Sequence, residues 1–178
     1  ENDTLKASVN LATKERSGLN AQVLKTELRI HPKLMEFSQL YLKTDRSELK
    51  DYFAMKYPSM ASMSDFIHAV TMNGHFDNST ISSDDIAYFA PTIKDWNRRF
   101  IIDGTVSGTV DALNGTDVYI NAGNSTSLNG NFSIVGLPDI NKAFINVEAK
   151  DLRTTYADAA SLVPSIKNVT AVNLRQLS

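Results

Sequence analysis

The three histidines are the side chains of this chain best suited to bind a metal ion or to transfer a proton. His31 comes directly before Pro32, and His68 and His75 are seven residues apart. In one uninterrupted strand this spacing places His68 and His75 on opposite faces. A zinc site needs three or four converging ligands, and no local sequence pattern supplies them. We therefore interpret the histidines as isolated strand residues and expect no metal site.

Two adjacent carboxylates, Asp84 and Asp85, could act as a general acid and base. They follow Ser82 at the start of a predicted helix, where negative charge is favourable near the positive end of the helix dipole. Ser82 and Asp85 also have the spacing of a capping box, with a hydroxyl at the N-cap and a carboxylate three residues later. Helix capping explains these residues better than catalysis.

Catalytic motifs are missing from the rest of the sequence. The string from Gly104 to Gly108 resembles a nucleophile elbow, but its serine, Ser107, is one position late and lies in an alternating strand. There is no P-loop and no dinucleotide-binding fingerprint. The chain has no cysteine, which excludes disulfides, thiolate metal sites and a cysteine nucleophile. We expect a protein that is not an enzyme and that holds no cofactor.

The composition is that of a folded chain without a strong electrostatic partner. Its 178 residues are 42% hydrophobic and 21% charged, with 18 basic and 20 acidic side chains. No five like charges follow one another, which argues against nucleic acid as a partner. No apolar run approaches the ~18 residues of a membrane span. Because the chain opens on Glu1 and stops within a pattern, we expect residues 1–178 to be a single β-rich segment of a longer protein.

Alternation of apolar and polar residues with period two is the dominant pattern, and it predicts strands with one buried face. In the first half it covers residues 5–11, 24–30, 40–42, 53–57 and 66–72. In the second half it covers residues 100–110, 118–122, 128–134 and 145–149, separated by short linkers rich in Gly, Asn, Asp and Pro. The sequence therefore predicts a mostly-β fold, an antiparallel meander that forms a trough-like or sandwich-like sheet.

Two short helices interrupt the predicted strands, and they resemble each other. Residues 82–94 align with residues 155–167 at a constant offset of 73, including the proline and the lysine near their ends. Thr155 and Asp158 repeat the capping pair formed by Ser82 and Asp85. We infer an internal repeat with helix-containing units around 66–97 and 139–170, possible units of a larger array.

The apolar residues of the second half share one phase and predict a continuous apolar sheet face. Two interpretations stay open: a core covered by the helices and other strands, or an open face that binds apolar chains. Gly104, Gly108 and Gly130 lie on this face, where they would leave room for a helix, a ligand or a bend. The candidate groove residues are Phe100, Ile102, Val106, Val110, Val118, Ile120, Leu128, Phe132, Ile134, Ile145 and Val147.

Several stretches carry a resemblance to a known family. They are Leu40–Ser47, Tyr52–Met55, Ser82–Pro91 with Trp96, Phe100–Leu113, Gly130–Asp139 and Asp151–Tyr156. Together they resemble the periplasmic region of TamB-like translocation and assembly module proteins, within the AsmA-like group. The resemblance covers most of the chain, from about Leu5 to Leu174, and its motifs are structural rather than catalytic.

The resemblance implies a long protein that is anchored in the inner membrane, of which this chain would be a periplasmic piece. It implies a β-strand trough with an apolar inside that takes part in outer-membrane biogenesis. The partners would be phospholipid acyl chains or the machinery that assembles outer-membrane proteins. Exposed strand edges could also pair two copies of the segment.

A second interpretation is a secreted β-sandwich module that binds carbohydrate or builds a surface structure. Sugar recognition favours aromatic platforms beside polar groups. Trp96, the only tryptophan, lies instead in the helical linker near Arg98 and Arg99. This weighs against carbohydrate binding.

Overall fold

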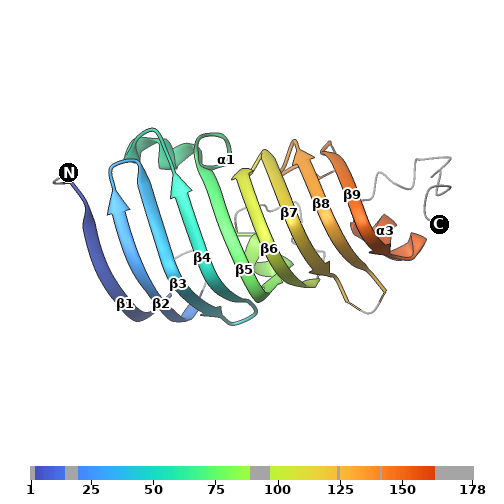
Figure 1. Cartoon of the computed structure of the whole chain (residues 1–178), viewed down its shortest axis with the longest axis horizontal. Helices are drawn as coiled ribbons and strands as arrows, with labels where there is room; N and C mark the ends of the chain where they lie inside the picture. The colour runs from blue at the N-terminus through green and yellow to red at the C-terminus, as the bar shows by residue number, and fades with distance from the viewer. Residues whose placement is uncertain (1–2, 15–19, 89–96, 124, 141, 163–178) are drawn as a thin grey trace.

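Nine antiparallel strands form one open sheet in a computed structural model that describes residues 3–14, 20–88, 97–123, 125–140 and 142–162. The strands follow one another in chain order across the sheet, and Figure 1 shows them side by side in a single layer. They are β1 (Leu5–Lys14), β2 (Asn20–His31), β3 (Leu34–Thr44), β4 (Glu48–Lys56), β5 (Thr71–Ser82), β6 (Arg99–Thr109), β7 (Ala112–Asn121), β8 (Ser127–Val135) and β9 (Phe144–Arg153).

The predicted antiparallel meander is confirmed. Every neighbouring pair of strands is antiparallel, as expected when short turns rather than helical crossovers connect most of them. All nine strands belong to the same sheet, so the described part of the chain is trough-like and does not contain two stacked sheets. Because the sheet is a single layer, no second sheet covers its apolar side. That side is either covered by the helices or by another molecule, or it is exposed to solvent.

A row of β-bulges crosses the middle of the sheet. In β3, β5 and β7 one extra residue shifts the pairing, and Gln39, Asn78 and Asp117 adopt φ values of 51°, 41° and 47°. These three positions are spaced evenly along the chain, each 39 residues after the one before. An inserted residue reverses which face the following side chains occupy. Within each of these strands the residues on the apolar face therefore change between odd-numbered and even-numbered positions, for example from Gly115 to Val118 in β7.

The partner strands keep their phase but place a residue with positive φ beside each bulge. These residues are Asp51 in β4, Gly104 in β6 and Gly130 in β8, with φ values of 93°, 108° and 152°. At Gly104 a Cβ atom would lie 2.4 Å from the carbonyl oxygen of Asp117, and at Gly130 it would lie 2.2 Å from that of Glu148. These glycines therefore let the neighbouring backbone approach. Of the helix, ligand or bend considered for these positions, none is shown at Gly104 and Gly130, where the close neighbour is the backbone of the next strand.

The segment between β4 and β5 differs from the prediction. Residues 66–72 were expected to form a strand, but a 3₁₀ helix (Met60–Asp65) and α1 (Phe66–Ala69) precede β5. Ile67 and Ala69 make the second face of this segment apolar too, which suits a helix packed against other elements. Val70 is fully buried, and the carbonyl of Ile67 accepts a hydrogen bond from the amide of Asp111. Tertiary packing overrides the alternation here.

The two predicted helices begin where expected. Ser82 accepts a hydrogen bond from the amide of Asp84 at the start of α2 (Ser83–Ile86), and Thr155 accepts one from the amide of Asp158 at the start of α3 (Tyr156–Leu162). Residues 89–94 and 163–167, with both prolines, lie outside the described residues. Each of these two helices follows an odd-numbered strand, β5 or β9, and so begins at the same end of the strands. The repeat at an offset of 73 stays a prediction.

Candidate functional site

The candidate site is the apolar face of the sheet, which the strand register assembles from cross-strand rows. Ile102 pairs with Ile120, and Ile120 pairs with Leu128. A second row runs through Val106, Gly115, Phe132 and Val147, and a third contains Leu113, Ile134 and Ile145. The row of Ile120 lies on one side of the bulge row, and the rows of Val106 and Ile134 lie on the other. The bulges keep all three rows on the same face.

Three candidate groove residues lie outside these rows. Val110 lies in the turn between β6 and β7, so its placement in a strand of the apolar face is wrong. The predicted strand ran through it because the alternation continues into the turn. Phe100 is in β6 and pairs with Ile81 of β5. Val118 is fully buried and faces Gly130 across the β7–β8 pair, so it belongs to the core beneath the bulge row.

The same rows continue through the N-terminal half, which the sequence-based candidates omitted. Leu5, Ile30, Met35, Met55 and Met72 pair in succession from β1 to β5 and continue the row that ends at Ile145. Leu28, Phe37 and Phe53 similarly continue the row of Val106. The alternation in residues 24–30 and 53–57 was a signal for these positions. Nothing local, however, linked them to strands in the second half.

Aromatic rings fill the places where this face has no other side chain. The ring centroids of Phe37 and Phe53 are 6.4 Å apart and tilted by 35°. The ring of Phe76 lies over Gly74, where a Cβ atom would come 2.6 Å from Phe76 Cζ. The ring of Phe132 lies over Gly115 in the same way. At each of these two glycines a ring therefore covers the backbone that has no side chain. The apolar surface is continuous across the glycine positions.

Most of the face is only partly buried. Among the candidates only Ile102 and Val118 are buried, whereas Val147 is 41% exposed. The edge strand β1 contributes Leu5 and Leu11, which are 60% and 43% exposed. Side chains of a closed core would be nearly inaccessible. Within the described residues the apolar face is therefore partly open to solvent.

The opposite face is polar and carries its own interactions. The guanidinium of Arg29 and the hydroxyl of Tyr52 both bind the carboxylate of Glu36, the latter at 2.8 Å. Burial acts to raise the pKa of Glu36, but these hydrogen bonds and the charge of Arg29 outweigh it and hold the pKa below its usual value. Ala54, which pairs with Glu36 across β3 and β4 on this side, is 2% exposed. This face is mostly polar, although it also exposes Ile101, Tyr119, Val135 and Phe144.

The carboxylates considered for catalysis have structural partners. Asp85 Oδ2 accepts hydrogen bonds from the hydroxyls of Thr44 at 2.6 Å and Ser47 at 2.5 Å. Asp84 instead pairs with Arg46 at 2.7 Å. Asp85 thus ties the β3–β4 turn to the start of α2, instead of closing a capping box with Ser82. Sequence reasoning missed this role because the partners lie about forty residues away.

The histidines are distributed over different elements. His68 is in α1 and pairs with Asp65, whereas His75 is in β5 and pairs with Asp51. The expectation that His68 and His75 share one strand is wrong, because α1 ends between them. In the described part of the chain, no three His, Asp or Glu side chains gather in a way that could hold a metal ion. No helix there is long and apolar enough to cross a membrane.

Comparison of the chain with protein-family models, with curated proteins and with solved structures gave no match.

Proposed function

We propose that this chain is a non-catalytic segment that holds apolar chains along the open face of its sheet. The observation that carries the proposal is the continuity of the apolar rows, which cross all nine strands while many of their side chains stay partly exposed. Soluble monomers rarely expose large contiguous apolar surfaces unless these surfaces bind something. The resemblance to TamB-like proteins supports acyl chains of phospholipids, or strands of outer-membrane proteins, as the bound material.

The geometry suits transport better than tight retention. Burial of a lipid chain contributes about 0.8 kcal/mol per CH₂ and has no preferred direction. The rows described above contain aliphatic and aromatic side chains and no charged residue that would fix one position of the chain. A bound chain could therefore move along the face in small steps. This mechanism fits a conduit of outer-membrane biogenesis.

The location is part of the same proposal. The segment would lie in the periplasm as part of a protein anchored in the inner membrane, as the resemblance implies. The outer strands β1 and β9 each have a single neighbour, so another strand could extend the sheet at either edge. Such a strand could come from a longer chain or from a second copy. Either would lengthen the apolar face without changing its character.

The proposal is tested by native mass spectrometry and lipid extraction on the chain purified from a bacterial host. Phospholipid should copurify with the wild-type chain and should be lost from the Val106→Asp and Ile120→Asp variants. Ser107→Asp and Asn121→Asp are matched controls, because each places the same charge on the polar face one residue away. Circular dichroism would confirm that all four variants are folded.

A clean, lipid-free mass of a folded wild-type chain would contradict the proposal. Retained phospholipid in a folded Val106→Asp or Ile120→Asp variant would contradict the assignment of the binding face. The alternative of a carbohydrate-binding sandwich gains no support from the single described sheet. Trp96, on which an aromatic platform would depend, lies outside the described residues.

A further inference from the structure

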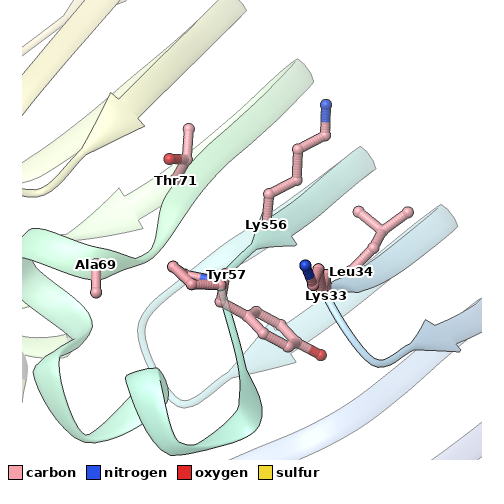
Figure 2. Close-up of a pocket in the computed structure, with 7 residues that line it drawn as sticks. Lys33, Leu34, Lys56, Tyr57, Ala69 and Thr71 are labelled. Atoms are coloured by element: carbon pink, nitrogen blue, oxygen red, sulfur yellow. The ribbon is translucent and has the colours of Figure 1, made fainter.

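A hollow of about 440 Å³ lies at one end of the inner strands, outside the apolar rows. It is bounded by the β2–β3 turn, the end of β4 and the start of β5, with α1 beside it. Leu34, Lys56 and Thr71 pair directly across β3, β4 and β5 and form one wall. Figure 2 shows their side chains on the same side of the strands. The hollow is therefore on the polar side of the sheet.

The floor of this hollow is apolar and fixed in place. Tyr57 is 2% exposed, its amide donates to the carbonyl of Lys33 at 3.1 Å, and its hydroxyl donates to the carbonyl of His31 at 3.4 Å. Pro58 and Ala69 complete the lining on the side of the helical segment. These contacts hold the β2–β3 turn against the end of β4 and so fix the shape of the hollow on this side.

The charge of the hollow is positive. Lys33 and Lys56 line it, and no carboxylate does. Neither lysine forms an ion pair with another residue that the structure describes, whereas Lys50, Lys142 and Lys150 do. Lys56 is close enough to Glu36 to help lower the pKa of that carboxyl, but Glu36 already binds Arg29 and Tyr52. Both ammonium groups therefore remain available to an external anion.

We propose that this hollow binds the head of an anionic amphiphile, a phosphate or carboxylate that carries an aliphatic chain. The two ammonium groups bind the anion, and Leu34 and Pro58 contact the first carbons of the chain. The inference deepens the proposed function and rests on it, because it states the charge of the lipid that the segment prefers. The hollow recognises the head, whereas the apolar face accepts chains without regard to the head.

The test compares three probes below their micellar concentrations: dodecyl phosphate, monolauroyl glycerol with the same chain and no charge, and inorganic phosphate. Binding to the whole chain is measured by isothermal titration calorimetry. Dodecyl phosphate should bind about tenfold more tightly than monolauroyl glycerol, as expected for two partly exposed charge pairs. The double variant Lys33→Gln/Lys56→Gln should lose this preference. Lys25→Gln/Lys43→Gln, which removes two exposed lysines from β2 and β3 outside the hollow, should keep it.

A second variant tests whether the lost preference for dodecyl phosphate is due to the lysines and not to misfolding. Thr71 is exposed, so Thr71→Glu should fold, and its carboxylate should occupy the lysines and remove the preference as well. Equal binding of both amphiphiles to the wild-type chain would overturn this inference but leave the proposed function intact. If inorganic phosphate bound as tightly as dodecyl phosphate, the hollow would recognise the anion alone and not an amphiphile. This result would also overturn the inference. Failure of both amphiphiles to bind would overturn the proposed function itself.

Discussion

The ring of Phe132 lies against the backbone of Gly115 on the neighbouring strand. A Cβ atom at position 115 would come 2.2 Å from Phe132 Cε1, so even a methyl group displaces the ring. We expect Gly115→Ala to lower the free energy of unfolding by about 1–3 kcal/mol, the usual cost of overpacking. Urea denaturation checks this. In a Phe132→Ala background the same substitution should cost nothing, and an equal loss there would show that the ring is not the cause.

Asp84 and Asp85 are adjacent, but their contributions to stability should differ. Asp85→Ala removes the carboxylate that accepts hydrogen bonds from the buried hydroxyls of Thr44 and Ser47, which should lower the free energy of unfolding by about 1–3 kcal/mol. Asp84→Ala removes an ion pair with Arg46, whose side chain is 55% exposed, and should cost less than about 1 kcal/mol. Thermal and urea melts of the two variants compare them directly. Equal losses would contradict the assignment.

Gln39 adopts the left-handed conformation at the first bulge of the row, although glutamine has no local hydrogen bond that favours it. Gln39→Gly should therefore raise the free energy of unfolding by about 0.5–1 kcal/mol. Asn73→Gly, at an exposed position of β5 without positive φ, should instead lower it by a similar amount, about 0.5–1 kcal/mol. Chemical denaturation gives both values, and a loss for Gln39→Gly would argue that the bulge is not strained.

The pKa of His68 should lie above the ordinary value of 6.5 for histidine, because its hydrogen bond to Asp65 and the charge of that carboxylate raise it. A raised pKa in the folded state stabilises the fold at pH values below the unfolded pKa. This stabilisation is lost as the pH rises through the folded pKa. NMR titration of the His68 ring measures the shift. In Asp65→Asn the pKa should return toward 6.5, and an unchanged pKa would contradict this cause.

The amino-acid sequence by itself determined the strands and the polarity of their faces. Alternation along residues 5–11 or 128–134 is a local property, and a strand puts alternate side chains on opposite faces whatever lies beside it. The same holds for Ser82 and Thr155, whose hydroxyls accept hydrogen bonds from backbone amides two and three residues later in the chain. These features could be predicted because cause and effect lie within one turn or one strand.

Only the tertiary structure decided how the faces join. The bulges at Gln39, Asn78 and Asp117 depend on backbone angles and on the neighbouring strand, so the sequence pattern did not reveal the change of parity in β7. Val70, directly after the helix at 66–69, is fully buried, and the alternation of the sequence does not predict the packing that buries it. The partners of Asp85 and the two lysines of the hollow come from separate turns and strands. Long-range register, rather than local propensity, brings such residues together.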